Sequence, residues 1–221
     1  MIIAIDGPAG SGKSTTAKLV GNEAGFLYID TGAMYRAMTL KVKNSGIAYS
    51  DRERIIELLD STVIEQIINQ VTKDTNTILD GKDVSVDIRT PEISKGVTEV
   101  CEISEVRRKL VELQRRMGRN GNVILDGRDI GTVVFPDADL KFFMVADIDI
   151  RAERRLKELT GKGIVTTFED VKDDIERRDN RDSSRSDSPL KPAEDAILID
   201  TSLLTIPQQA ALIIGYIRKK I

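Results

Sequence analysis

The first sixteen residues, MIIAIDGPAGSGKSTT, combine an apolar segment, a glycine-rich loop and a helix-forming segment. Residues 2–5 are apolar over a length that fits a short strand buried on both faces. Residues 7–14 match the pattern G-x-x-x-x-G-K-[ST], and residues 13–24 can continue as a helix that stops at Gly25. Strand, loop and helix in this order form the context in which the pattern binds phosphate, so the sequence predicts a site for a nucleoside triphosphate.

The chemistry of such a loop explains its residue types. Glycines let the backbone curl so that successive N–H groups face phosphate oxygens, and the following helix adds the positive end of its dipole. Lys13 can reach the β- and γ-phosphates, and the hydroxyl of Ser14 can face Mg²⁺. A chance match is the alternative, against which the flanking strand and helix argue. The predicted ATP-binding residues are Gly7, Pro8, Ala9, Gly10, Ser11, Gly12, Lys13, Ser14 and Thr15.

The amino-acid composition limits the kinds of chemistry that this chain can perform. The 221 residues carry a net charge of −3, which gives no support to a general role in binding nucleic acid. The absence of histidine removes imidazole catalysis and the usual zinc sites. Cys101 is the single cysteine, and we predict a buried structural thiol rather than a nucleophile. Because we find neither a signal-like N-terminus nor an apolar run of about 20 residues, we expect a cytoplasmic protein with no membrane partner.

Short apolar runs alternate with helical patterns along the chain. They predict an α/β fold with a doubly wound, five-stranded parallel sheet, because parallel strands need helical crossovers. The predicted strands cover residues 2–5, 26–30, 122–126, 140–146 and 196–200. The predicted helices cover residues 13–24, 31–43, 51–61, 91–118, 149–159, 168–181 and 206–220.

Residues 46–100 have a different pattern. Residues 63–71 and 75–79 favour strands, Asp80-Gly81 is a hairpin signal, and residues 82–86 alternate like a return strand. An antiparallel hairpin does not fit a parallel core, so we interpret this region as an inserted lobe of a single domain. The predicted parts are a core of residues 1–45, 101–150 and 168–221, the lobe at 46–100, and a lid at 151–167 with a mobile tip at 160–163.

Triphosphate binding alone leaves kinases, GTPases, motor ATPases and non-catalytic sensors open. A GTPase needs an Asn-Lys-x-Asp segment after a late strand, and the late strands here are followed by other sequences. Arginines are frequent near the predicted strand ends, and arginine forks neutralise the charge of a transferring phosphoryl group. They suggest two phosphorylated ligands that meet head to head. A solvated helix face is the simpler explanation for Arg108, Arg115, Arg116 and Arg177.

Longer motifs resemble those of bacterial cytidylate kinases over essentially the whole chain. They are DTGAMYR at residues 30–36, IR at 88–89, VR at 106–107, DGRDIGTVVFP at 126–136, and the stretch at 178–190. The resemblance implies a P-loop nucleoside monophosphate kinase, a phosphotransferase that moves the γ-phosphoryl group of ATP to CMP or dCMP and uses Mg²⁺. Thr31 stands where some relatives have serine, which keeps the hydroxyl.

The resemblance also implies roles for single residues. The implied catalytic residues are Lys13, Arg128, Arg151 and Arg155, and Ser14 would serve the metal. The residues implied to bind substrate are Thr31, Tyr35, Arg36, Arg89, Thr98, Arg107, Arg128, Asp129, Arg178, Asp182 and Arg185. Arg36 and Arg128 would hold the CMP phosphate. Thr31, Arg178 and Asp182 would contact the sugar.

The implied contacts to the base agree with the chemistry of cytosine. Cytosine presents an N4 amino donor beside the acceptors N3 and O2, whereas uracil presents an acceptor in place of that donor. Asp129 can accept from N4 while Arg107 donates to N3 or O2, which would favour CMP over UMP. A helix N-cap after the strand is the alternative role for Asp129.

Two other functions stay open from the residues alone. A uridylate/cytidylate, thymidylate or shikimate-type kinase would share the loop and the sheet, although the DGRD segment and the long insert argue against it. A nucleotide-sensing module would bind ATP without turning it over. We expect ATP and CMP or dCMP as ligands, no nucleic-acid partner, and a monomer.

Overall fold

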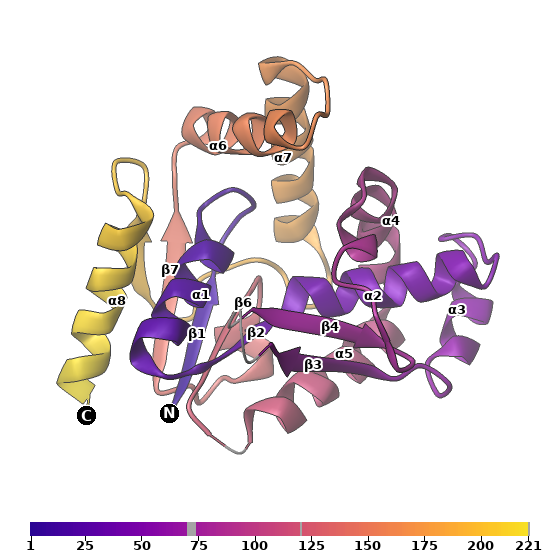
Figure 1. Cartoon of the computed structure of the whole chain (residues 1–221), viewed down its shortest axis with the longest axis horizontal. Coiled ribbons are helices and arrows are strands. Elements are labelled where there is room, and N and C mark those ends of the chain that lie inside the picture. The colour runs from indigo at the N-terminus through magenta and orange to yellow at the C-terminus, as the bar shows by residue number, and fades with distance from the viewer. Residues whose placement is uncertain (70–73, 120, 221) are drawn as a thin grey trace. The chain divides into compact units, whose positions relative to one another are not determined.

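The computed structural model describes residues 1–69, 74–119 and 121–220, and its chain divides into two compact units (Figure 1). The first unit consists of Met1–Phe26 and Asn122–Ile221, and the second consists of Leu27–Gly121. The predicted lobe at 46–100 falls within the second unit. The finer boundaries of core, lobe and lid stay predictions.

A parallel sheet forms the centre of the first unit. Its strands β1 (Ile2–Asp6), β6 (Val123–Gly127), β7 (Leu140–Val145) and β8 (Ile197–Asp200) follow the order β6-β1-β7-β8. With β2 (Leu27–Asp30), which belongs to the second unit, the parallel strands number five, as the sequence predicts. The predicted α/β fold class is therefore confirmed.

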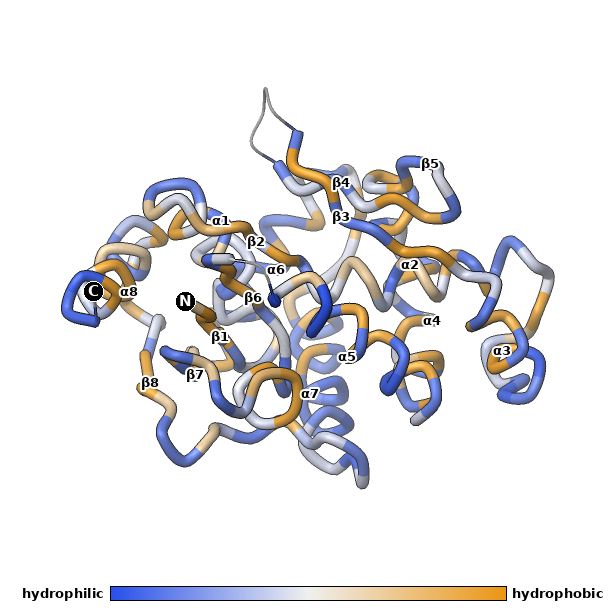
Figure 2. The backbone as a smooth tube through the Cα atoms, turned by 90° about the horizontal axis from the view of Figure 1, so that it is seen from below, coloured by the Kyte–Doolittle hydropathy of each residue, from blue (hydrophilic) through white to orange (hydrophobic). Residues whose placement is uncertain are grey.

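Burial explains why these short segments form strands. Ile3, Ala4 and Ile5 of β1 have no exposed surface, and neither do Ile124 and Leu125 of β6. The hydrophobic colour marks both strands in Figure 2. A strand with neighbours on both edges and packing on both faces needs such an apolar run.

The helices of the first unit follow the predicted ranges closely. They are α1 (Lys13–Ala24), α6 (Ile148–Gly161), α7 (Phe168–Ser184) and α8 (Ile206–Lys220). Helix α1 ends at Gly25, whose φ of 73° is the left-handed conformation that glycine adopts readily. Helices α1 and α8 lie side by side in Figure 1, and α6 packs on α7 through Ala152, Val171 and Ile175. Among the described residues, no helix is long and apolar enough to cross a membrane.

The second unit combines helices with a small antiparallel sheet. Its helices are α2 (Thr31–Asn44), α3 (Arg52–Leu58), α4 (Pro91–Cys101) and α5 (Ser104–Gly118), with a short 3₁₀ turn at Asp87–Arg89. The sheet consists of β3 (Ile64–Ile68), β4 (Thr75–Leu79) and β5 (Lys82–Asp83) in that order. Asp80 and Gly81 have φ of 49° and 81°, which a two-residue hairpin turn requires, so the predicted hairpin is confirmed.

Four predicted elements of this unit are wrong in extent. The return strand predicted at 82–86 ends at Asp83, because the carboxylate of Asp83 accepts hydrogen bonds from the amide and the hydroxyl of Ser85 and turns the chain away. The helix predicted at 91–118 is two helices, interrupted where buried Ile103 adopts an extended conformation. The helix predicted at 51–61 ends at Leu58, whose carbonyl accepts the hydroxyls of Ser61 and Thr62. The strand predicted at 63–71 covers residues 64–68, and its last two predicted residues lie outside the described ranges.

Candidate active site

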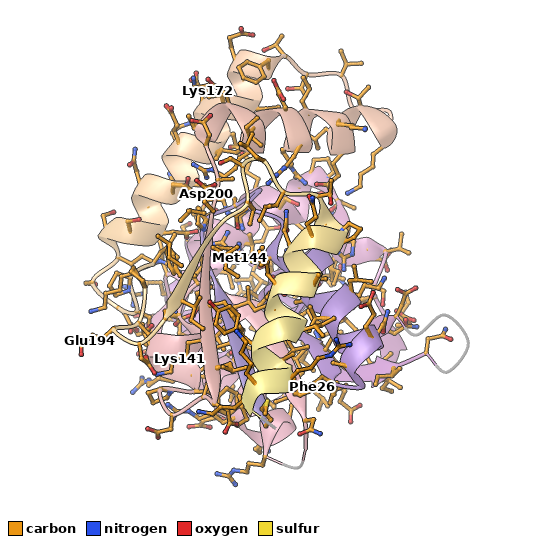
Figure 3. The ribbon with its side chains drawn as sticks, turned by 90° about the vertical axis from the view of Figure 1, so that its left-hand side faces the viewer. Phe26, Lys141, Met144, Lys172, Glu194 and Asp200 are labelled. Carbon is orange, nitrogen blue, oxygen red and sulfur yellow. The ribbon has the colours of Figure 1, made fainter. Side chains whose placement is uncertain are left out.

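The glycine-rich loop joins β1 to α1 in the first unit, as predicted. Gly7 has a φ of 146°, and a Cβ at this position would lie 2.1 Å from the carbonyl oxygen of Met144, a residue near the end of β7 that is labelled in Figure 3. Gly12 has a φ of 92° and packs against the side chain of Gln209, so a larger residue would displace that side chain. The loop conformation therefore depends on glycine at both positions.

Three side chains from distant parts of the chain support this loop and the start of α1, and two of them bond to carbonyl groups of the loop. The hydroxyl of Thr201 donates to the carbonyl of Ser11 at 2.9 Å, and Nη1 of Arg151 donates to the carbonyl of Ala9 at 3.2 Å. Gln209 on α8 accepts a hydrogen bond from the hydroxyl of Thr16 at 2.6 Å. The first two bonds fix the orientation of peptide groups in the loop, and the third ties α1 to α8.

Lys13 is buried and bonded within the loop. Its Nζ donates to the carbonyl of Pro8 at 2.6 Å and to the hydroxyl of Ser11 at 3.3 Å. Burial and the positive charge of Arg128 lower the pKa of Lys13 to about 7, although Asp126 and Asp6 oppose the shift. A polyanionic ligand would supply the negative charge that favours the protonated amine.

The hydroxyl of Ser14 donates to Oδ2 of Asp126 at 2.6 Å. Asp126 is 6% exposed and lies near the carboxyl end of β6. A hydroxyl and a carboxylate from these two elements are the oxygen ligands that hold Mg²⁺ in P-loop proteins. The donor set therefore fits the predicted metal, and it adds Asp126, to which the sequence analysis assigned no role.

Asp6 at the end of β1 organises the segment that follows Asp129. Its carboxylate accepts the backbone N–H groups of Ile130 at 2.8 Å and Gly131 at 2.7 Å. Residues 130–134 form a single π-helical turn, and the side chain of Asp129 makes no capping hydrogen bond to it. The alternative prediction of an N-cap at Asp129 is therefore wrong, because Asp6 takes those N–H groups.

Arginines and aspartates cluster where β6 ends and along α7. Nε of Arg128 donates to Asp182 at 2.7 Å, and Nη2 of Arg185 donates to the other oxygen of Asp182 at 2.9 Å. Burial alone would raise the pKa of Asp182, but Arg128, Arg185 and Arg178 together lower it. The structure thus brings these four predicted substrate-binding residues into one electrostatic group.

The two predicted lid arginines differ in their surroundings. Arg151 is buried and pairs with Asp179 of α7, in addition to its bond to the loop. Arg155 pairs with Glu158 one turn along α6 and is 37% exposed in its side chain, so the structure does not bring it to the loop. The arginines at 108, 115, 116 and 177 are exposed, which confirms their interpretation as solvated helix charges.

The second unit carries the remaining predicted residues. Arg36 and Arg89 both contact the carboxylate of Asp30, at 3.5 and 3.2 Å. The guanidinium of Arg107 lies over the ring of Tyr35, 5.8 Å from its centroid. The remaining two are Thr31, which is buried in the first turn of α2, and Thr98, which is partly buried in α4.

Comparison with known proteins identifies the family. A family model described as cytidylate kinase matches residues 3–219. The chain belongs to the cytidylate kinase family. It is 48% identical over 220 residues to a protein named cytidylate kinase from Lactobacillus johnsonii, covering 100% of this chain and 95% of that one. It is 50% identical over 217 residues to another from Caldanaerobacter subterraneus, covering 98% and 94%.

A solved structure agrees with the fold. An uncharacterized protein from Eubacterium ventriosum superposes with a TM-score of 0.55 at 15% identity, covering 99% of this chain and 98% of that one. This likeness supports the fold alone. The predicted family and the prediction of a kinase are confirmed by the sequence relatives.

The sequence analysis of this cytidylate kinase family member missed several site residues. Asp6 and Asp126 could have been found, because each follows a buried apolar run directly and precedes a glycine. The same kind of signal marks Asp30. Thr201 and Gln209 carried no local signal, because their partners in the loop lie about 190 residues away.

Asp6 provides a test of this arrangement through the pH dependence of stability. Burial raises its pKa from 3.8 to about 6, although the two backbone N–H groups oppose the shift. Because the folded-state pKa lies above the unfolded one, stability from this group is present at low pH and is lost as pH rises through 6. Relative to Asp6→Asn, we expect the free energy of unfolding of the natural protein to fall by about 1 kcal/mol between pH 5 and pH 7.

Urea unfolding of both proteins at several pH values measures this difference. The Asn variant loses one acceptor at every pH, which adds a constant offset and leaves the slope interpretable. Parallel pH profiles would show that the carboxylate of Asp6 does not titrate in this range.

Proposed function

We propose that this protein is a (d)CMP kinase that uses the residues described above as follows. It transfers the γ-phosphoryl group of ATP to CMP or dCMP and releases ADP and CDP or dCDP, the activity that its family membership supports. The match of the family over residues 3–219 is the observation that carries this assignment. The glycine-rich loop, with its bonded carbonyls and buried Lys13, agrees with it.

On the ATP side, the loop at residues 7–15 binds the phosphates through its backbone N–H groups and the amine of Lys13. Ser14 and Asp126 hold Mg²⁺. Bound there, the ion would supply positive charge beside the phosphates of ATP. As the family resemblance implies, Arg151 and Arg155 act on the phosphates from the lid at 151–167. Arg155 would have to leave its pair with Glu158 to do so.

On the acceptor side, Arg36 and Arg128 hold the phosphate of CMP, with Arg89 and Arg185 beside it. Thr31, Arg178 and Asp182 bind the sugar. The base contacts Arg107 and Asp129, with Tyr35 and Thr98 lining its pocket. Aligning the two phosphates and stabilising the equatorial charge is most of what phosphoryl transfer requires. We further propose that the protein works in the cytoplasm as a monomer.

An assay that couples ADP release to a detectable signal tests the function. Mg·ATP is offered with CMP, dCMP, UMP, AMP, GMP, dTMP and shikimate as acceptors. We expect high activity with CMP and dCMP and weak activity with UMP. Tight ATP binding with no acceptor-dependent ADP release would instead indicate a nucleotide sensor.

The metal site is tested through Ser14. Ser14→Ala removes the hydroxyl ligand, and we expect the apparent affinity for Mg²⁺ to fall by about tenfold or more. Titration of Mg²⁺ at a fixed ATP concentration measures it. Ser14→Thr keeps a hydroxyl and is the matched control, so an equal loss in both variants would contradict a ligand role.

The base contact is tested through Asp129. In Asp129→Ala the acceptor for the N4 amino group is gone, whereas the phosphate contacts stay. A buried mismatch costs about 1–3 kcal/mol, so we expect the ratio of kcat/KM for CMP over UMP to fall by roughly 5- to 150-fold. An unchanged ratio would show that another residue reads the base.

A further inference from the structure

The carboxylate of Asp30 lies at the centre of a cluster in the second unit. It contacts two arginines that come from different elements, Arg36 on α2 and Arg89 in the 3₁₀ turn. The side chain of Asp30 is 11% exposed, and those of Arg36 and Arg89 are 20% and 52% exposed. A nearly buried carboxylate thus joins two cations that still reach solvent.

The position of this carboxylate is fixed by further bonds. Oδ1 accepts the backbone N–H of Ala33 at 2.7 Å and so caps α2. Gln66 of β3 donates to the backbone carbonyl of Asp30 at 2.7 Å and accepts its N–H at 3.0 Å. A Cβ at Gly32 would lie 3.2 Å from Nη1 of Arg36 and 3.4 Å from Oδ1 of Asp30, so glycine leaves room for the pair.

Both arginines keep donors for a further anion. A guanidinium carries five N–H donors in a fixed plane, and Asp30 contacts one terminal nitrogen of each. Nε of Arg36 is buried and has no hydrogen-bond partner among the residues that the structure describes. An arginine loses rotamer freedom when it is fixed, so a carboxylate that orients it beforehand reduces the entropic cost of binding phosphate.

We propose that Asp30 is a positioning residue for the phosphate of the acceptor, which holds Arg36 and Arg89 in the orientation that this phosphate requires. The inference rests on the proposed role of Arg36 in binding CMP. Asp30 acts through the arginines and makes no contact with the reacting atoms.

The choice of variants separates this role from helix capping. Asparagine caps a helix as well as aspartate does, so Asp30→Asn keeps the bond to Ala33 and loses the charge that holds the arginines. Asp51→Asn is the matched control, because Asp51 caps α3 through the N–H of Arg54 in the same way. A merely structural role predicts that both Asn variants behave like the natural protein.

We expect Asp30→Asn to raise KM for CMP by about tenfold, which corresponds to about 1.4 kcal/mol, and to leave KM for ATP within about twofold. A binding measurement without turnover adds a second readout. The ratio of the dissociation constants of cytidine and CMP reports the phosphate contact, and it should fall in Asp30→Asn but not in Asp51→Asn.

The outcomes distinguish the inference from the proposed function. If the natural protein releases no ADP in response to CMP, the proposed function fails. If it does, and Arg36→Met raises KM for CMP while Asp30→Asn leaves both KM and the binding ratio unchanged, the role of Asp30 is overturned.

Discussion

Carboxylates at strand ends are the constraint on which the site depends. Asp6, Asp30 and Asp126 each lie at the end of a short apolar strand, and each residue is buried. Such a carboxylate costs free energy to bury unless it accepts hydrogen bonds or pairs with a cation. Each one therefore fixes a functional segment. Asp6 holds the turn after Asp129, Asp30 caps α2 and contacts two arginines, and Asp126 accepts the hydroxyl of Ser14.

The first unit concentrates positive charge around a buried amine. Arg128 and Arg178 both lower the pKa of Lys13, and burial lowers it more. Asp182 and Asp126 balance part of this charge. Burial by itself would lower the pKa of Arg128, but these carboxylates outweigh burial and the pKa is raised. The balance is incomplete at Lys13. A site of this kind therefore binds a polyanion more tightly than its hydrogen bonds alone would allow.

Local patterns in the sequence were enough to predict the architecture. The parallel strands, the glycine loop, Gly25 and the hairpin at Asp80-Gly81 all depend on residues that are neighbours in the chain. Two of the errors came from side chains with local partners. At Asp83, for example, a bond to Ser85 ends a strand that alternation had extended. The supports of the loop could not be predicted, because Thr201 and Gln209 meet it only after folding. The candidate site residues were predicted from motif resemblance. The sequence around an arginine in a helix is the same kind of sequence whether that arginine is solvated or binds phosphate.

The charged groups of the site already have partners within each unit. Lys13 is bonded to the carbonyl of Pro8, Arg128 to Asp182, and Arg36 lies near Asp30. A ligand phosphate must therefore replace or share these partners rather than meet bare cations. Exchange of one hydrogen bond for another contributes about 1 kcal/mol, much less than the gross strength of the bond. Discrimination then comes from ligands that leave an exchanged group unpaired. This is the physical basis of the proposed selection of the acceptor by the edge of its base.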